Sequence, residues 1–227
     1  MTARLAVALD TTSVKTARDW AAMVEPHVDI VKLGLEFYLR NGAAGVREVR
    51  AAAPECGLFL DLKLHDIPAT VSGGARAVAD LDPDYLTVHA SGGPAMVSAV
   101  AQALPRTRIA AVTVLTSIGP DDLEALGLPP ARELVPRWAD VAVAAGARAL
   151  VSSALEVEVL RNHLPAEVHL ITPGIRPVGA DAQDQSRVAT PAAAVAWGSD
   201  LLVVGRPITA AHEPAAAAAA IAEQMRG

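Results

Sequence analysis

Short apolar segments alternate along this chain with longer segments that carry helix signals. Eight apolar segments stand out, at residues 5–9, 30–33, 58–63, 85–89, 109–115, 150–152, 169–172 and 201–204. Most of them are apolar on both faces, which is typical of parallel strands covered by helices, because an antiparallel strand usually leaves one polar face in water. The pattern therefore predicts eight buried parallel strands.

Helix start signals lie between these strands. Ser13 is placed to cap a helix that runs through Met23, and Thr190 followed by Pro191 is a cap with proline at the first helical position. The alanine-rich segment 215–224 has high helix propensity, so we expect it to form the last helix.

Eight strand–helix units in 227 residues predict an α/β fold, a (β/α)8 TIM barrel that spans residues 1–227 as a single domain. The connections are long enough for right-handed crossovers. In such barrels the functional side chains come from the carboxyl ends of the strands. Polar residues and loop glycines of this chain lie within or just after the predicted strands, at Asp10, Lys32, Asp61, Lys63, Thr116, Ser117, Gly174, Arg176, Gly205 and Arg206.

Composition and charge narrow the function class. Apolar residues make up 52% of the chain and aromatic residues only 3%, which favours an aliphatic helix-on-sheet core over a stacking surface for bases. The formal net charge of -6, without a basic stripe, argues against binding polymeric nucleic acid. Cys56 is the single cysteine, and the sequence has no signal-peptide pattern and no apolar segment of membrane-spanning length. We therefore expect a cytoplasmic protein that binds no metal and no membrane.

The segment 58–70 places charged residues in the most apolar part of the sequence. If residues 58–63 form a strand, Phe59, Asp61 and Lys63 share one face, because side chains alternate along a strand. Isolated buried charges are costly to desolvate, so the two charged groups must pair or line a polar pocket. By themselves these residues leave open whether the Asp–Lys pair is structural or catalytic.

Lys32 and two glycine-containing loops favour the catalytic interpretation. Lys32 lies in the middle of the second predicted strand, where Asp61 and Lys63 on the next strand would complete a row of alternating charges. Such a row keeps a lysine protonated, which suits proton donation to a carbanion better than nucleophilic attack. Gly205 and Arg206 follow the eighth strand, where these barrels often hold a phosphate beside a short extra helix.

These residues occur in a pattern that resembles the orotidine 5'-phosphate decarboxylase family. The motif Asp-x-Lys-x-x-Asp-Ile-Pro-x-Thr at residues 61–70 is similar to the family's signature, and the similarity extends along essentially the whole chain. The other similar segments are residues 7–10, 31–34, 114–117, 172–177, 184–187 and 204–209. The resemblance implies a decarboxylase that converts orotidine 5'-monophosphate to uridine 5'-monophosphate and CO2 without a cofactor, in the final step of de novo pyrimidine nucleotide synthesis.

The resemblance also implies a role for each matching residue. Lys32, Asp61, Lys63 and Asp66 would form a charged catalytic network in which Lys63 donates the proton and Asp61 lies near the departing carboxylate. Asp66 and Thr70 would reach into the partner's site across a homodimer. The other substrate-binding residues would be Asp10 and Lys32 at the ribose hydroxyls, Thr116 at the pyrimidine, and Arg176, Gln185, Gly205 and Arg206 in the phosphate region.

Two alternatives remain open at this point. A related barrel that acts on a sugar phosphate through a magnesium-bound enediolate would, as the family comparison implies, carry a metal-binding glutamate where this chain has Lys32. A non-catalytic nucleotide-binding protein should have lost Asp61, Lys63 or Asp66, and all three are present. We also expect residues 119–130 to form a lid, and His89 and His65 to form structural hydrogen bonds.

Overall fold

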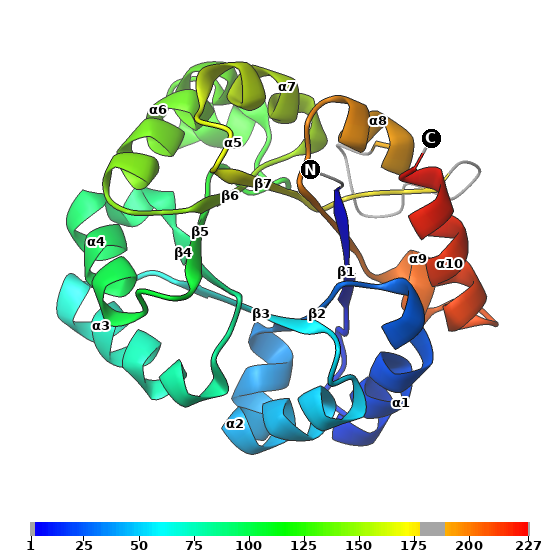
Figure 1. The fold of residues 1–227 in the computed structure, drawn as a ribbon. Helices are drawn as coiled ribbons and strands as arrows, with labels where there is room; N and C mark the ends of the chain where they lie inside the picture. Colours follow the sequence, from blue (N-terminus) through cyan, green and yellow to red (C-terminus); the bar gives the residue numbers. More distant parts are fainter. Residues whose placement is uncertain (1–2, 178–188, 227) are drawn as a thin grey trace.

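The computed structural model describes residues 3–177 and 189–226, which form a closed barrel of eight parallel strands surrounded by helices (Figure 1). Each strand pairs with the next one along the chain, and β8 closes the barrel by pairing with β1. The strands are β1 (Arg4–Ala8), β2 (Ile30–Gly34), β3 (Gly57–Leu64), β4 (Tyr85–His89), β5 (Arg108–Val112), β6 (Ala149–Val151), β7 (His169–Thr172) and β8 (Leu201–Val204). The predicted (β/α)8 architecture is confirmed.

Helices connect the strands and cover the outside of the barrel (Figure 1). The α-helices are α1 (Val14–Val24), α2 (Leu35–Ala52), α3 (Pro68–Ala77), α4 (Pro94–Ala103), α5 (Pro120–Ala125), α6 (Ala131–Ala144), α7 (Ala154–His163), α8 (Pro191–Ala196), α9 (Arg206–Thr209) and α10 (Pro214–Gln224). Short 3-10 turns are η1 (Glu25–His27), η2 (Ala79–Leu81) and η3 (Ala90–Gly92). No helix within the described ranges is long and apolar enough to cross a membrane.

Both predicted helix caps are present. The Ser13 hydroxyl accepts a hydrogen bond from the Thr16 backbone N–H at 3.1 Å, and Thr190 accepts one from the Ala193 N–H at 3.2 Å. A side-chain acceptor at this position satisfies a backbone donor that has no partner in the first helical turn.

The core has two layers separated by the sheet. Alternation along β3 places Phe59 in the cluster inside the barrel, whereas Leu58, Leu60 and Leu62 belong to the cluster under the helices. The inner cluster is small, because many of its residues are alanines. Phe59 and Tyr85 pack within it, with ring centroids 5.5 Å apart. Inner-face side chains that lie beyond this cluster, toward the carboxyl ends of the strands, can therefore line a cavity.

The fifth predicted strand is wrong at its end. The prediction ran to residue 115, but β5 ends at Val112, and a turn follows in which the Ile118 N–H donates to the Leu115 carbonyl at 3.0 Å. Val114 remains buried although it pairs with no strand. The apolar pattern therefore predicted burial correctly, but burial alone does not distinguish a strand from a turn at the end of a barrel. The sixth predicted strand, at residues 150–152, is displaced by one residue, since β6 runs from Ala149 to Val151.

Candidate active site

A cavity of about 440 Å³ lies at the carboxyl ends of the strands. Its apolar wall includes Phe59, Val112, Val151, Ile171 and Val203. The predicted site residues that line it are Asp10, Lys32, Asp61, Lys63, Thr116, Arg176, Gly205 and Arg206. Residues from opposite ends of the sequence therefore meet in one pocket, as the predicted barrel requires.

Alternating charges form a continuous row along one side of this cavity. Lys32 Nζ lies 3.4 Å from Oδ1 of Asp10 and 3.3 Å from Oδ2 of Asp61. The other oxygen of Asp61, Oδ1, lies 2.7 Å from Lys63 Nζ. The row therefore comes from the loop after β1, which carries Asp10, and from two neighbouring strands, β2 with Lys32 and β3 with Asp61 and Lys63.

The two central members of the row are buried and remain ionised. Burial by itself would lower the pKa of Lys32, but the carboxylates of Asp61 and Asp10 outweigh it, and the pKa is raised. Burial would raise the pKa of Asp61, but the charges of Lys32 and then Lys63 outweigh it, and the pKa is lowered. The charges of Lys32 and Asp61 therefore offset each other's desolvation, and the Asp61 carboxylate is held between Lys32 and Lys63.

Lys63 occupies an unusual backbone conformation. Its φ is 49°, in the left-handed region, which non-glycine residues rarely adopt and which costs on the order of 1–3 kcal/mol. The pairing of β3 with β4 shifts register between Leu60 and Leu64, so Lys63 belongs to a bulge. Bulges redirect side chains near active sites. Here the Lys63 ammonium lies against Asp61, and its side chain is 37% exposed at the cavity.

The glycine-containing loops after β7 and β8 form the far wall of the cavity. Gly174 has a φ of 75°, and a Cβ added to Gly205 would lie 3.7 Å from Oδ2 of Asp10. Arg176 is buried, and its guanidinium donates to the Ile175 carbonyl at 3.0 Å. Arg206 begins α9 and also lines the cavity. Gln185 lies outside the described residues.

Asp66 and Thr70 do not line the cavity of their own barrel. Both are exposed, Asp66 in the loop after β3 and Thr70 in the first turns of α3. The Asp66 carboxylate accepts a hydrogen bond from the Ile67 N–H at 2.6 Å, and Ile67 itself is 66% exposed. Within one chain the predicted network therefore contains Lys32, Asp61 and Lys63 but not Asp66.

The sequence interpretation missed Thr87, a fully buried residue on β4. Its hydroxyl lies 3.0 Å from Oδ1 of Asp61 and 2.8 Å from the backbone nitrogen of Lys63. A hydroxyl between two apolar residues, Leu86 and Val88, in the strand next to the one that carries the charges was the available signal. His89, two residues further along β4, packs against the His65 ring with centroids 5.2 Å apart. Burial, followed by the charges of His65 and Lys63, lowers the pKa of His89.

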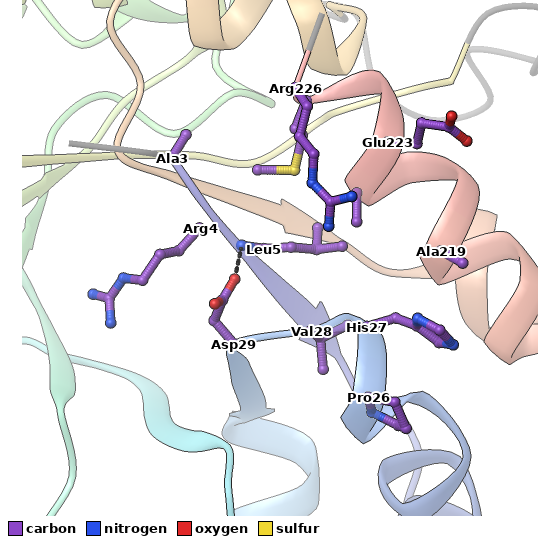
Figure 2. Close-up of a pocket in the computed structure, with 12 residues that line it drawn as sticks. Ala3, Arg4, Leu5, Pro26, His27, Val28, Asp29, Ala219, Glu223 and Arg226 are labelled. Carbon is purple, nitrogen blue, oxygen red and sulfur yellow. Dashed lines mark hydrogen bonds between the residues drawn. The ribbon is translucent and has the colours of Figure 1, made fainter.

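A second cavity, of about 580 Å³, lies at the opposite end of the barrel, between the start of β1, η1 and α10 (Figure 2). Its carboxylate Asp29 accepts a hydrogen bond from the Leu5 N–H at 2.8 Å. Arg4 extends away from Arg226, and its guanidinium donates to the Tyr85 hydroxyl. Asp29 and Arg4 are therefore bonded to the barrel itself, as is usual for the amino-terminal face.

A metal ion in a protein needs several donor side chains gathered around one point. Among residues 3–177 and 189–226, no three His, Cys, Asp or Glu side chains gather in an arrangement that could hold a metal ion. Each oxygen of the Asp61 carboxylate lies against an ammonium group, Oδ2 against Lys32 and Oδ1 against Lys63. Positive charge at those positions repels a divalent cation.

Comparisons of the sequence and of the fold with known proteins lead to the same family. The model of the family described as "Orotidine 5'-phosphate decarboxylase / HUMPS family" matches residues 3–221. Orotidine 5'-phosphate decarboxylase of Thermobifida fusca is 59% identical over 227 residues, which cover 100% of this chain and 97% of the relative. The Frankia casuarinae protein of the same name is 51% identical, over 97% of this chain and 86% of its own length. The crystal structure of orotidine 5'-phosphate decarboxylase from Lactobacillus acidophilus superimposes with a TM-score of 0.87 at 35% identity, and the match covers 99% of this chain and 100% of that one.

Proposed function

We propose a function from the premise that this chain belongs to the orotidine 5'-phosphate decarboxylase / HUMPS family. The proposed activity is that of a carboxy-lyase, the decarboxylation of orotidine 5'-monophosphate to uridine 5'-monophosphate and CO2. One observation carries the proposal: an ionised carboxylate, Asp61, is held between Lys32 and Lys63 at the wall of a cavity that also reaches Arg206. The names of relatives that match the full chain support the same activity.

The reaction depends on fixed charges around the substrate more than on side chains that form covalent bonds with it. Cleavage of the bond between the pyrimidine ring and its carboxylate leaves the electron pair on a ring carbon that has no neighbouring electron sink. A fixed ammonium beside that carbon stabilises the developing negative charge and then transfers its proton to it. We assign this role to Lys63, and solvent returns the proton to the amine after the product leaves.

We assign to Asp61 a position near the departing carboxylate. Its lowered pKa keeps it negatively charged when the substrate binds. Two carboxylates in contact repel each other, and that repulsion falls as neutral CO2 leaves, so the transition state is favoured relative to the bound substrate. Lys32, which is anchored between Asp10 and Asp61, keeps the carboxylate of Asp61 in place.

Substrate binding is assigned to the remaining cavity residues. Asp10 and Lys32 would contact the ribose hydroxyls, and Thr116 the pyrimidine ring. The phosphate would lie against the backbone of Gly205 and the guanidinium groups of the arginines at 176 and 206, with Gln185 nearby. A planar guanidinium matches the geometry of phosphate oxygens. Binding energy from the phosphate, far from the reacting carbon, can then hold the pyrimidine in its reactive position.

We further propose that two chains form a homodimer in which Asp66 and Thr70 complete the partner's site. Both residues are exposed and neither lines the cavity of its own chain, and the apolar Ile67 between them is also exposed. A mixed dimer of Lys63→Ala and Asp66→Ala chains tests this, because one of its two sites contains neither substitution. When equal amounts of the two variants exchange subunits at random, about half of the dimers are mixed and one site in each is intact. Recovery toward about a quarter of the parent rate supports the proposal, whereas a mixture as inactive as each variant alone contradicts it.

The activity itself is tested by following the loss of substrate absorbance with the purified protein in an excess of metal chelator. We expect conversion of orotidine 5'-monophosphate to an equal amount of uridine 5'-monophosphate. Lys63→Ala serves as the matched control and should bind the product nucleotide without turning over the substrate. Persistence of orotidine 5'-monophosphate, together with magnesium-dependent turnover of a sugar phosphate, would favour the metal-dependent sugar-phosphate alternative. Nucleotide binding without any turnover would favour a non-catalytic protein.

A further inference from the structure

Thr87 is a polar residue in the most buried part of the sheet. It lies in the middle of β4, it has no exposed surface, and its neighbours in the strand, Leu86 and Val88, are fully buried apolar residues. A buried hydroxyl is costly unless it is hydrogen-bonded. The contacts of Thr87 therefore indicate what this residue does in the barrel.

Its hydroxyl replaces a missing backbone acceptor. Leu60 pairs with Leu86 and Leu64 pairs with Val88, so β3 advances four residues where β4 advances two. This mismatch leaves the backbone of β3 out of register with the carbonyls of β4 between the two pairs. The Lys63 N–H, within the bulge, donates to Thr87 Oγ1 at 2.8 Å. That bond holds the left-handed backbone conformation of Lys63 in place.

The same hydroxyl also orients the carboxylate of Asp61. Thr87 Oγ1 donates its proton to Oδ1 of Asp61 at 3.0 Å, and this is the oxygen that the Lys63 ammonium contacts at 2.7 Å. A single side chain therefore fixes the backbone of Lys63 and the oxygen against which its amine lies. In that position Lys63 and Asp61 cannot shift independently, because both are tied to β4.

We propose that Thr87 is a positioning residue of the decarboxylation, which holds Lys63 and Asp61 in their mutual geometry through one hydroxyl. This inference rests on the proposed function of the two charged residues. Thr87 itself does not line the cavity, so its effect on the reaction passes through Lys63 and Asp61. Misplacement of reacting groups by small distances lowers the rate of the chemical step more than it lowers substrate affinity.

The test compares Thr87→Val with Thr87→Ser and with a matched control. Valine keeps the shape of threonine and removes both hydrogen bonds, so we expect kcat to fall roughly 10- to 100-fold. The KM should change by less than about threefold, because the ribose and phosphate contacts are made elsewhere. Thr87→Ser retains the hydroxyl and should restore most of kcat. The control is Thr113→Val, since the buried Thr113 hydroxyl donates only to the Val151 carbonyl, and its kcat should equal that of the parent.

A second measurement separates this inference from the proposed function. The side-chain carboxyl of Asp61 can be titrated by carbon-13 NMR in the parent and in Thr87→Val, without substrate. The groups that face this carboxyl are Lys32 from β2, Lys63 from β3, and Thr87 and His89 from β4. Loss of the Thr87 donor should raise the Asp61 pKa, whereas Thr87→Ser should leave it near the parent value.

The outcomes are distinct. A kcat of Thr87→Val equal to that of the parent, or a Thr87→Ser variant as slow as Thr87→Val, overturns the inference. If Thr87→Val is too unstable to purify, Thr87→Ala and Thr87→Ser are compared, and equal rates of these two again overturn it. A parent protein that does not decarboxylate the substrate refutes the proposed function, and the Asp61 titration then decides the positioning role by itself.

Discussion

Replacing Lys32 with methionine removes the positive charge that lies between two carboxylates. Methionine has a similar length and leaves no large cavity. At the observed 3.3 Å, and with an effective dielectric constant of ~20, the attraction between Lys32 and Asp61 is about 5 kcal/mol. The two side chains are only 9% and 13% exposed, so solvent screens this attraction little.

The measured effect will be smaller than this attraction. Part of it is offset by the desolvation of both charges, and Lys63 still neutralises Asp61 in the variant. Removing one partner of a buried ion pair typically costs about 3–5 kcal/mol. With the second ammonium in place, we expect the free energy of unfolding to fall by about 2–3 kcal/mol in Lys32→Met at pH 7.

The pH dependence follows from the two shifted pKa values. The folded-state pKa of Asp61 is lowered, so its contribution to stability is present above the pKa of an unfolded aspartate and is lost as the pH falls through the folded value. The pKa of Lys32 is raised, so its contribution is present below the pKa of an unfolded lysine and is lost as the pH rises through the folded value. In Lys32→Met the acid loss should begin at a higher pH, because the Asp61 pKa rises.

Urea unfolding followed by circular dichroism, at equal protein concentrations, measures these differences. The parent, Lys32→Met, Asp61→Asn and the double variant form a thermodynamic cycle. In the Asp61→Asn background, Lys32→Met should cost little or should stabilise the protein, because it relieves repulsion between two lysines. A similar loss of stability in both backgrounds would show that Lys32 contributes through packing, and the electrostatic reasoning would be refuted.

Two further predictions concern the phosphate end and the amino end of the barrel. Arg206→Ala should raise the KM for the phosphorylated substrate at least about tenfold with a smaller change in kcat, since it removes a charged hydrogen-bond donor; steady-state kinetics equal to the parent would show that the phosphate is bound elsewhere. Burial, followed by the charge of Arg108, lowers the pKa of His169, whose Nδ1 lies 2.8 Å from the Tyr85 hydroxyl. The neutral ring is favoured in the folded state, so the free energy of unfolding should decrease as the pH drops below the pKa of an unfolded histidine. Thermal unfolding between pH 7 and 5 should show a smaller decrease for His169→Gln, and an identical decrease would contradict this assignment.

Several parts of the site could be predicted because they depend on local periodicity. Alternation along residues 58–63 put Asp61 and Lys63 on the same face as Phe59, and in the structure Phe59 packs inside the barrel while both charged residues line the cavity. The position of Lys32 in the second strand predicted its contact with Asp61, which is present at 3.3 Å. Both predictions required only a period of two and the order of neighbouring strands.

Other parts could not be predicted because they depend on a second strand. The bulge at Lys63 is a mismatch between β3 and β4, and no pattern within residues 57–64 announces it. The hydroxyl of Thr87 is visible in the sequence, but only the register between the two strands shows that it supplies the acceptor that the mismatch requires. The end of β5 was missed for the same reason, since pairing ends at Val112 while burial continues through Val114.

The sequence by itself determined the eight strands, the barrel, and the end of the barrel at which the charged residues gather. These features follow from hydrophobic periodicity, helix caps and strand order, which can be recognised within short segments of the chain. The tertiary structure decided the left-handed conformation of Lys63, the oxygen of Asp61 that it contacts, and the hydroxyl of Thr87 that ties the two together. These depend on the register between two strands, which is set by the packing of the whole barrel.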